Sequence, residues 1–553
     1  MVVLEPTVLE EVPVTSYSDH PTLSMRTGTW KYLQPRYEDK LPPCAHACPA
    51  GNDISKILAL LACGDLKGAG KWLRAGNPLA ATLGRVCPHS CQQSCNRDSL
   101  GGALAIHRLE RFLGDQSLQY SPQLQPPTGQ KVAVIGAGPA GITSAYLLAQ
   151  AGHEVHIFDD KPKPGGFLRT GIPAFRLPKE ILDQEIALVE SVGVQFHQNI
   201  RVGRDLTFED LKSRFAVVIV AAGLHASRPL KISDNGQAHV YHGIDVLERM
   251  QTQESLSIPG VVAVLGGGNT AIDVARSLLR AGSTPVIVYR RTEAEMPAIP
   301  SEIEEAKAEG VAFHFLAAPS RIVVEGGKIV ALECQRMRLG EPDASGRRAP
   351  VPLPAPEFRL PVSAVVAAIG ETADLEFLPE DLRNHGGFAT QSVLDGDFRG
   401  VFVAGDVATN SGTVAAAVGS GRQVAATVDR YLRGEQPLTE NPVLPSLWPR
   451  ALNHAQVADA QLLNPAYFLP EVSCPLPEPS QASSTEWAVN EARRCLGCGT
   501  CNGCLNCYHW CPDVAIQVSS ASAALKIDLE HCKGCGICVE ECPRGAMAMA
   551  EVG

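Results

Sequence analysis

The long middle part of this 553-residue sequence contains almost no cysteine, although the whole chain has 18. Only Cys334 and Cys474 occur between Cys95 and Cys495, and no C-x-x-C or C-x4-C pair lies there. The body therefore has no candidate for a redox-active thiol pair. Because most cysteines gather near the two ends, and disulfides are rare in the cytoplasm, we expect a metal-binding head and tail rather than a disulfide framework.

Long apolar runs and an excess of positive charge are also missing. No stretch approaches the ~18 apolar residues of a membrane-spanning helix. The formal net charge is −11, from 48 basic and 59 acidic residues, which argues against a nucleic-acid partner. The acidic N-terminus MVVLEPTVLEEVP has neither the basic nor the apolar region of a signal peptide. We therefore expect a cytoplasmic globular protein of about three or four domains.

The last eight cysteines form two runs of the form C-x2-C-x2-C-x3-C-P, which start 31 residues apart. This pattern is typical of bacterial ferredoxins with two [4Fe–4S] clusters, in which the fourth cysteine of each run binds the other cluster. Zinc sites are the alternative, but eight thiols in two runs that end in Cys-Pro are unusual for them. The predicted ligand sets are Cys501, Cys504, Cys507 and Cys542 for one cluster and Cys532, Cys535, Cys538 and Cys511 for the other.

A glycine fingerprint follows the first apolar strand of the body, in QKVAVIGAGPAGITSAYLLAQAGHEVHIFDD from Gln130. The glycines of G-x-G-x-x-G allow a tight turn, the approach of a pyrophosphate and the contact between helix and strand. Asp159 stands 18 residues beyond the last glycine, where it can accept hydrogen bonds from a ribose hydroxyl. A nucleotide with a free 2′-hydroxyl, such as FAD, is therefore predicted. Its candidate residues are Gly136, Gly138, Pro139, Gly141 and Asp159.

The pattern recurs about 130 residues later in VAVLGGGNTAIDVARSLLRAGSTPVIVYRR. Tyr289 stands where the first motif has its acid, and two arginines follow it. A guanidinium pair can hold a ribose 2′-phosphate by bidentate hydrogen bonds, whereas an acid would repel it. The alternative is a solvated strand end, but the position favours an NADPH site. The candidate residues are Gly266, Gly268, Asn269, Thr270, Arg290 and Arg291, with Ala271 at the third glycine position.

A third motif lies in GVFVAGDVATNSGTVAAAVGSGRQVAATV, which predicts a strand, the pair Gly405-Asp406 and a helix from about Thr413. Two nucleotide sites followed by this motif are the plan of flavin disulfide reductases, in which the NADP domain is inserted into the FAD domain. In that plan the Asp reaches the FAD, and the helix N-terminus faces the flavin and stabilises negative charge. The further FAD candidates are Gly405, Asp406, Thr413 and Val414.

The stretches GGFLRTGIPAFRLPKEI (Gly165–Ile181), GGGNTAIDVAR and YRRTEAEMPAIPSEIEEAKAEGV (Tyr289–Val311) resemble the small subunit of bacterial glutamate synthase. Dihydropyrimidine dehydrogenase and NADH-dependent ferredoxin:NADP oxidoreductases have similar parts. The resemblance covers about Pro42 to Arg433. It implies electron exchange between NAD(P)H and two [4Fe–4S] clusters in a helical N-terminal domain, with the substrate chemistry in another subunit or domain. The FAD residues that it implies are Gly166, Leu168 and Arg169.

The resembled family opens with a motif like EARRCLxC, which is missing from the head of this chain. The five cysteines of the head motifs cannot fill two four-ligand sites. EARRCLGC stands instead at Glu491–Cys498, directly before the ferredoxin pattern. The family positions suggest that the tail completes a head cluster, and the alternatives are a spare thiol pair or a rubredoxin-like or zinc half-site completed by a partner. The suggested ligands are Cys44, Cys95, Cys495 and Cys498.

The family positions suggest a second head cluster on Cys48, Cys87, Cys91 and a non-cysteine ligand. Relatives use Glu or Gln on the following helix, and Glu110 in GALAIHRLERFLGD stands at about the right distance. The alternative is a surface Glu that pairs with neighbouring arginines. Fifteen cysteines and Glu110 make sixteen ligands, which is enough for four [4Fe–4S] clusters.

The expected fold class is α/β, with tandem Rossmann-like FAD and NADP domains, an N-terminal α-helical iron–sulfur domain and a C-terminal α+β ferredoxin domain. The expected ranges are 1–40 for an N-terminal arm, 41–125 for the helical domain, 128–243 and 375–435 for the FAD domain, 244–374 for the NADP domain, 436–490 for a Pro-rich linker and 491–553 for the ferredoxin domain.

Together these features predict an NAD(P)H-dependent iron–sulfur flavoprotein oxidoreductase that exchanges electrons with ferredoxin or a partner enzyme. NADPH would pass a hydride to the flavin, and the flavin would pass single electrons to the clusters, so no catalytic side chain is named. One alternative is the reverse flow, in the flavin subunit of a 2-oxoacid:ferredoxin oxidoreductase that reduces NADP+. Another is a non-catalytic electron-transfer subunit of a complex such as a glutamate synthase. A homodimer and a hetero-complex are both open.

Overall fold

The computed structural model describes residues 32–99, 101–120, 122–230, 232, 239–252, 256, 258–343, 346–383, 399–435, 484–501, 503, 505–518 and 525–551. They form two compact units. The terminal unit contains the described residues up to Pro122 and from Gly434 onward, and the central unit spans Gln123–Arg433. Cys504, Cys474, residues 1–31 of the expected arm and residues 436–483 of the expected linker lie outside the described residues.

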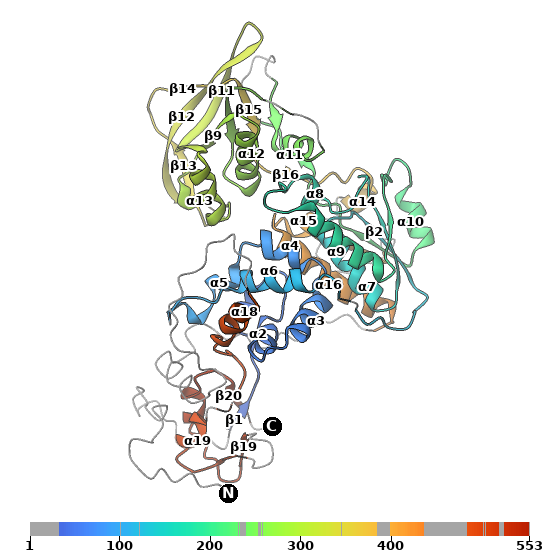
Figure 1. Ribbon diagram of the computed structural model, residues 1–553, viewed down its shortest axis with the longest axis vertical. Helices are drawn as coiled ribbons and strands as arrows, with labels where there is room; N and C mark the ends of the chain where they lie inside the picture. The colour runs from blue at the N-terminus through green and yellow to red at the C-terminus, as the bar shows by residue number, and fades with distance from the viewer. Residues whose placement is uncertain are drawn as a thin grey trace. The chain divides into compact units, whose positions relative to one another are not determined.

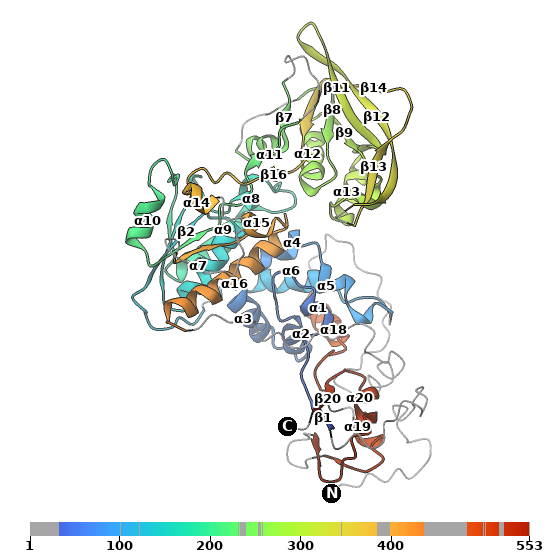
Figure 2. The same cartoon turned by 180° about the vertical axis from the view of Figure 1, so that it is seen from behind.

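The first sheet of the central unit is parallel, with strand order β17-β5-β2-β3-β4. Its strands are β2 (Lys131–Ile135), β3 (Glu154–Phe158), β4 (Gln195–His197), β5 (Val217–Val220) and β17 (Val401–Val403). β17 pairs with β5, so the chain returns to this sheet after a long insertion. α7 (Pro139–Gln150) and α16 (Val414–Leu432) lie side by side (Figures 1 and 2), and a Cβ on Gly421 would lie only 2.5 Å from the Ala140 carbonyl oxygen.

The insertion contains a second parallel sheet with strand order β10-β9-β8-β15-β7. The strands are β7 (Tyr241–His242), β8 (Val261–Leu265), β9 (Thr284–Tyr289), β10 (Ala312–Phe315) and β15 (Ala364–Ala367), and the helices are α11 (Gly243–Gln251), α12 (Asn269–Arg280) and α13 (Pro300–Glu309). An antiparallel sheet of β11 (Ala317–Glu325), β12 (Lys328–Pro342), β13 (Arg348–Pro352) and β14 (Phe358–Pro361) precedes β15.

Short elements complete the central unit. They are α8 (Phe167–Thr170), α9 (Lys179–Ser191), α10 (Phe208–Arg214), α14 (Glu380–Arg383) and α15 (Asp406–Thr409), with the two-stranded ribbon of β6 (Ala226–Ser227) and β16 (Glu371–Thr372). The ribbon lies where the chain leaves the first sheet and returns from the second. None of the helices that the structure describes is both long and apolar enough to cross a membrane.

The terminal unit consists of a helical head and a small α+β tail. The head contains α1 (Pro43–His46), α2 (Ile54–Ala62), α3 (Leu66–Gly76), α4 (Ala80–Val86), α5 (Ser90–Gln93) and α6 (Ile106–Gln116). The tail contains α18 (Thr485–Arg493), α19 (Asn506–His509), β18 (Ile516–Val518), β19 (Leu525–Ile527), α20 (Ile537–Glu540) and β20 (Met547–Glu551).

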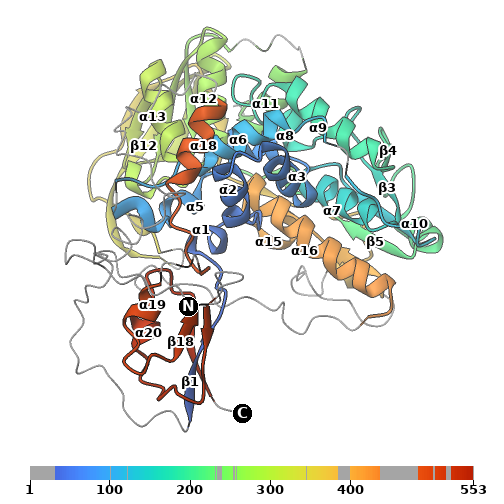
Figure 3. The same cartoon turned by 60° about the horizontal axis from the view of Figure 1, so that its bottom comes forward.

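The two ends of the chain are interlocked. α18 packs against α2 and α6 (Figure 3), and its residues Ala488 and Ala492 are fully buried in the same core as Leu58 and Leu113. In return, β1 (Leu33–Tyr37) of the head pairs with β20 of the tail. The expected linker range thus includes most of a helix packed on the head, and the expected arm contributes a strand to the tail.

Candidate redox centres

The first glycine loop lies between β2 and α7. Gly136 has φ +106°, and a Cβ there would come within 2.4 Å of the Ala221 carbonyl oxygen. A Cβ on Gly141 would lie 2.0 Å from the Gly136 carbonyl oxygen, so helix and strand touch here. At Gly138, the N-cap of α7, a Cβ would meet no described atom within 4 Å beyond its chain neighbours. The loop therefore fits a pyrophosphate that approaches the backbone at the helix N-terminus.

Asp159 follows β3 and lies beside this loop. Its Oδ2 accepts a hydrogen bond from the Ala137 N–H at 2.6 Å, and its Oδ1 accepts one from the Lys161 N–H at 2.9 Å. Burial raises the pKa of Asp159, and these two donors act against that rise. Because a carboxylate oxygen can accept more than one hydrogen bond, a ribose hydroxyl can still bind here.

Segment Gly165–Ile181 continues from the same loop. A Cβ on Gly166 would lie 2.8 Å from the Gly138 Cα, so the two backbones are in close contact. Leu168 is 1% exposed. The Arg169 Nε donates to the Pro164 carbonyl oxygen at 2.6 Å, and its guanidinium also pairs with Asp183. Arg169 therefore already has protein partners.

The motif around Gly405 and Asp406 follows β17 of the first sheet and contains the starts of two helices, α15 and α16. Gly405 has φ +79°, and Asp406 follows it at the start of α15. The Asp406 Oδ1 accepts from the Gly412 N–H at 3.1 Å, while burial raises the pKa of this carboxyl. The Thr413 Oγ1 accepts from the Ala416 N–H at 3.3 Å and caps α16, which begins at Val414 as the sequence predicts.

The second glycine loop, between β8 and α12, repeats the geometry of the first. Gly266 has φ +143°, and a Cβ there would lie 2.1 Å from the Ala368 carbonyl oxygen. Gly268 is the N-cap of α12, and a Cβ there, as at Gly138, would meet no described atom within 4 Å beyond its chain neighbours. The Asn269 Oδ1 accepts from a backbone N–H at 2.9 Å, and the Thr270 hydroxyl donates to the Glu371 carboxylate at 3.4 Å. This loop also fits a dinucleotide pyrophosphate.

The two arginines after Tyr289 have different surroundings. The Arg291 side chain is buried, pairs with Asp343 and donates from Nε to the Arg348 carbonyl oxygen at 2.7 Å. Arg290 is exposed. Arg291 is therefore engaged with the β12–β13 hairpin, and Arg290 is the more accessible cation for a 2′-phosphate.

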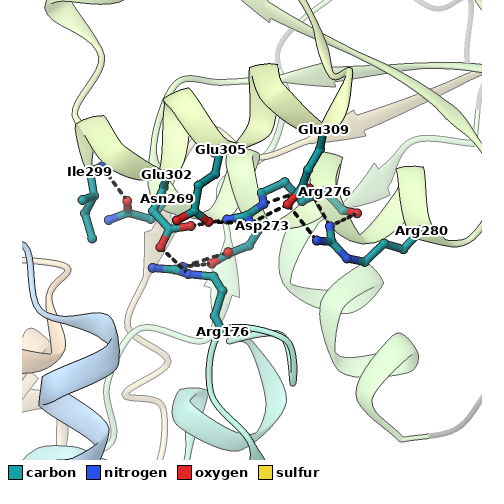
Figure 4. Close-up of polar contacts among 9 residues, drawn as sticks. All are labelled: Arg176, Asn269, Asp273, Arg276, Arg280, Ile299, Glu302, Glu305 and Glu309. Atoms are coloured by element: carbon teal, nitrogen blue, oxygen red, sulfur yellow. Dashed lines mark hydrogen bonds and ion pairs between the residues drawn. The ribbon is translucent and has the colours of Figure 1, made fainter. Parts of the chain in front are cut away.

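An ion-pair network joins segment Gly165–Ile181 to the helices of the second sheet (Figure 4). Arg176 donates to both oxygens of Asp273 on α12, at 2.8 and 2.7 Å, and its Nε lies 2.8 Å from Glu302 on α13. Arg276 pairs with Glu302 and with two further glutamates of α13. Burial raises the pKa of Asp273 to about 6, although Arg176 holds it lower than burial alone would. This network connects the segment that follows the first sheet to α12 and α13, the helices that follow strands of the second sheet.

In the terminal unit, three of the expected ligand groups surround cavities. The first, here called the Glu110 cavity, has about 520 Å³ of space that opens to solvent, and Cys48, Cys87, Cys91 and Glu110 line it. The Asn52 Nδ2 donates to the Glu110 Oε1 at 2.7 Å, with a second, longer contact from Asn77 at 3.4 Å. These carboxamides orient the carboxylate among the three thiols. Glu110 is therefore not merely a surface residue of α6.

The tail holds two similar cavities. The Tyr37 cavity has about 280 Å³ of space that opens to solvent and is lined by Cys501, Cys507 and Cys542, and the Tyr37 hydroxyl lies 3.4 Å from the Cys507 Sγ. The Lys533 cavity has about 330 Å³ of space that opens to solvent and is lined by Cys511, Cys532, Cys535, Cys538 and Lys533. In both cavities the fourth cysteine of one run joins cysteines of the other run, as the ferredoxin pattern predicts.

The fourth group, here called the shared group, consists of Cys44 and Cys95 from the head and Cys495 and Cys498 from the tail. Burial raises the pKa of Cys44 well above its usual value, and the thiols of Cys495, Cys498 and Cys95 raise it further. Cys495 packs against the same core as Cys44 and Cys95. The structure thus brings these four side chains together, although 400 residues separate Cys95 from Cys495.

The four groups of the terminal unit form two neighbouring pairs. Cys91, of the Glu110 cavity, also raises the pKa of Cys44 in the shared group. Cys507, of the Tyr37 cavity, raises the pKa of Cys538 in the Lys533 cavity after burial, which is the larger cause. No group of three or more His, Cys, Asp or Glu side chains in the described part of the chain is arranged to hold a single metal ion. Cysteine thiols are the usual ligands of [4Fe–4S] clusters.

Three models of known protein families match parts of this chain. A family model described as pyridine nucleotide-disulphide oxidoreductase matches residues 130–421. The chain belongs to this family. Two further models match the terminal unit of the oxidoreductase: one described as dihydropyrimidine dehydrogenase domain II, 4Fe-4S cluster, at residues 37–121, and one described as 4Fe-4S binding domain at residues 525–548. The predicted fold class and the combination of nucleotide-binding and iron–sulfur domains are thereby confirmed.

Three relatives are informative. The oxidoreductase is 40% identical to the NADP(+)-dependent formate dehydrogenase subunit beta of Moorella thermoacetica, over 71% of this chain and 60% of that protein. It is 35% identical to the NADPH-Fe(3+) oxidoreductase subunit beta of Geobacter sulfurreducens, over 74% and 66%. It is 34% identical to the NAD-dependent dihydropyrimidine dehydrogenase subunit PreT of Salmonella typhimurium, over 70% and 91%. The chain therefore spans less than two thirds of the first two relatives.

Several residues of these sites give no signal in the sequence. Asn52 and Asn77 orient Glu110, but no spacing links them to it. Arg176 lies inside a stretch that carries the family resemblance, yet its partners are about 100 residues away in the sequence. Tyr37 belongs to the expected arm and reaches a tail cysteine only because β1 pairs with β20.

Proposed function

We propose that this oxidoreductase moves electrons between NADPH, one FAD and four [4Fe–4S] clusters, and exchanges them with ferredoxin or a partner redox subunit. The observation that carries the proposal is the presence, in one chain, of two dinucleotide loops and four groups of cysteine thiols. When bound, the flavin supplies the step from two-electron hydride chemistry to single-electron transfer. The proposed location is the cytoplasm, where thiols stay reduced.

The residues of the central unit are proposed to bind and orient the two nucleotides, FAD and NADPH. The backbone of the first loop and the helix N-termini at Gly138 and Thr413 are proposed to hold FAD, with Asp159 accepting from its ribose. The second loop is proposed to hold NADPH, with Arg290 on the 2′-phosphate and Arg291 supporting it through the hairpin. This division is favoured by the free backbone at both loops and by the exposure of Arg290.

The residues of the terminal unit have the task of ligation. The proposed sets are Cys48, Cys87, Cys91 and Glu110; Cys44, Cys95, Cys495 and Cys498; Cys501, Cys504, Cys507 and Cys542; and Cys511, Cys532, Cys535 and Cys538. Because burial raises the pKa of most of these thiols, iron must displace their protons to bind. The proximity of the Glu110 cavity to the shared group, and of the two tail cavities to each other, favours stepwise electron transfer between the head and the tail.

The reverse direction is a second candidate. The Moorella relative is named as NADP(+)-dependent and as a subunit, which favours a partner that supplies electrons while this chain reduces NADP+. The Geobacter relative is named with NADPH as reductant, which favours the forward direction. Both names support a partner subunit.

The test uses the anaerobically purified chain. We expect about sixteen irons and one FAD per chain, together with NADPH:viologen reductase activity. About eight irons would remove the two head clusters from the proposal. Full iron and FAD without any NADPH:viologen activity would instead indicate an electron-transfer subunit. Rates with a low-potential ferredoxin, measured in both directions, separate NADPH oxidation from NADP+ reduction.

A further inference from the structure

The strand β1 comes from the front of the chain but forms a sheet with the last strand of the tail. It pairs with β20 in antiparallel register, and Tyr37 lies opposite Met547 (Figures 1 and 2). Beyond the strand, the Lys40 Nζ donates to the Met547 carbonyl oxygen at 3.0 Å, and the Lys40 N–H donates to the Gly499 carbonyl oxygen at 2.9 Å. Hydrogen bonds on both sides of Tyr37 therefore hold it against the tail.

One face of β1 meets both tail cavities. Side chains two residues apart on a strand point to the same face. On β1, Pro35 lines the Lys533 cavity and Tyr37 lines the Tyr37 cavity. Tyr37 also packs against the core that contains Cys507, Ile516 and Met547. A single strand from the front of the chain thus contributes one side chain to each of the two tail cavities.

These two side chains differ in what they can offer to a cluster ligand. The Tyr37 hydroxyl lies 3.4 Å from the Cys507 Sγ, which is within hydrogen-bonding distance of a sulfur atom. A cysteine that binds iron is a thiolate and can only accept a hydrogen bond, whereas a phenol is protonated at neutral pH. The Tyr37 hydroxyl is therefore the donor when a cluster is bound. Pro35 has neither a side-chain donor nor a backbone N–H.

A hydrogen bond to a ligand sulfur stabilises the two redox states of a cluster unequally. A cluster with its thiolates is anionic, and it gains one more negative charge when it accepts an electron. A donor is held more strongly by the more negative acceptor, so it stabilises the reduced form more than the oxidised form. Removal of such a donor therefore lowers the reduction potential of the cluster.

We propose that the Tyr37 hydroxyl donates a hydrogen bond to the Cys507 thiolate and thereby raises the reduction potential of the cluster in the Tyr37 cavity. Reduction adds one electron to that cluster, and the hydroxyl keeps its proton, so no proton is transferred. This inference rests on the proposed function. It names a residue outside every cysteine motif, on a strand from the front of the chain, that sets the potential of one of the four clusters.

The Lys533 cavity has no hydroxyl side chain among the described residues that line it. Its cation, Lys533, is 71% exposed and pairs with Asp513 at 3.3 Å, so solvent and the acid screen it. Its sulfurs accept backbone donors, such as the Gly534 N–H at 3.4 Å from the Cys532 Sγ, which a side-chain substitution does not remove. A substitution of Tyr37 is therefore expected to change the potential of one tail cluster and not of the other.

The experiment is an anaerobic redox titration of the full-length protein, followed by electron paramagnetic resonance, with iron content measured for each variant. Tyr37→Phe removes the hydroxyl and keeps the ring, so one of the one-electron transitions should move to lower potential. The expected change is about fivefold in the oxidised-to-reduced ratio at fixed potential, which is about 41 mV for one electron. Tyr508→Phe is the matched control and should keep all potentials, because Tyr508 directly follows Cys507 but is 37% exposed and its ring contacts His509.

The outcomes separate the two proposals. Unchanged potentials in a Tyr37→Phe protein with full iron content, or an equal shift in Tyr508→Phe, overturn the role of Tyr37 and leave the proposed function intact. If Tyr37→Phe loses iron, replacement of Tyr37 by 3-fluorotyrosine decides, because the fluorine makes the hydroxyl a stronger donor while the ring and the hydroxyl remain. A raised potential then supports the proposal, and an unchanged potential or lost iron overturns it. Too little iron in the wild-type protein would remove the proposed function, and this inference with it.

Discussion

The ion pair between Arg176 and Asp273 leads to a quantitative prediction for the central unit. The two side chains are 6% and 3% exposed, and they join segment Gly165–Ile181 to α12. Arg176→Met removes the cation and leaves the Asp273 carboxylate buried. Removing one partner of a buried pair costs about 3–5 kcal/mol, and we expect the lower value of about 3 kcal/mol because Arg276 also acts on Asp273.

This loss should be visible in thermal unfolding. For the roughly 310 residues of the central unit, an unfolding entropy of about 2.1 cal/mol/K per residue gives about 0.65 kcal/mol/K. A loss of about 3 kcal/mol therefore lowers Tm by about 5 °C, which differential scanning calorimetry can measure. NADPH-driven flavin reduction should also slow, because the pair joins segment Gly165–Ile181, beside the first glycine loop, to α12, which begins at the second glycine loop.

The prediction has a pH dependence of defined sign. Burial raises the pKa of Asp273 to about 6 while Arg176 is in place. Without the guanidinium this pKa rises further, so the variant takes up a proton when it folds near neutral pH. The difference in unfolding free energy between wild type and Arg176→Met should therefore be largest above about pH 7. It should shrink as the pH falls through 6, where the carboxyl becomes neutral in both proteins.

A double-mutant cycle with Asp273→Asn tests the pair itself. We expect the double variant to be much less destabilised than the sum of the single variants, since each substitution removes the same interaction. Arg280→Met is the control, because the Arg280 side chain is 42% exposed and its pair with Glu309 should contribute less than about 1 kcal/mol. Additive losses for Arg176 and Asp273, or a deficit that does not change with pH, would refute the reasoning.

Three further predictions concern the proposed cofactor sites. Replacing Cys495 and Cys498 by Ser should remove about four irons per chain, whereas Cys63→Ser, at an exposed cysteine, should remove none. Glu110→Ala should lose the cluster of the Glu110 cavity or change its resonance spectrum, and Glu110→Cys should retain the iron; an unchanged spectrum in Glu110→Ala would exclude ligation. Gly138→Ala should leave the stability of the flavin-free protein unchanged but weaken FAD binding at least about tenfold, since the new methyl group meets the ligand and not the protein; normal flavin content would contradict this reading.

Much of the fold could be predicted because the informative patterns are local. Each glycine fingerprint stands between an apolar strand and a helix, and Gly136, Gly141 and Gly266 have the close contacts that the fingerprint requires. The cysteine spacing of the tail likewise predicts which thiols meet around each tail cavity. Arg291 shows the limit of this approach. Its position predicts a nucleotide contact, but the β12–β13 hairpin brings Asp343 to it from elsewhere in the sequence.

Other parts of the sites depend on contacts between the two ends of the chain, which periodicity does not reveal. The pairing of β1 with β20 and the docking of α18 on α2 follow no local pattern. The return of the tail to the head was accessible only indirectly, from the cysteine count of the head and the displaced EARRCLGC motif, and the pairing of β1 with β20 was not predicted. The number of cysteines is informative here because each cluster needs a fixed number of ligands. A strand, in contrast, can pair with any other strand of suitable register.

The displaced motif has a physical consequence for folding. Because Cys495 and Cys498 come from the tail while Cys44 and Cys95 come from the head, a cluster on the shared group would crosslink the two ends of the chain. The buried thiols must lose protons to bind iron, so the crosslink should strengthen as the pH rises. Cluster binding would then stabilise the contacts between the head and the tail, which are also the contacts that bring the thiols of the two parts close together. In such an arrangement a terminal unit without iron loses both its electron path and part of its stability, which ties the assembly of the clusters to the folding of the unit that carries them.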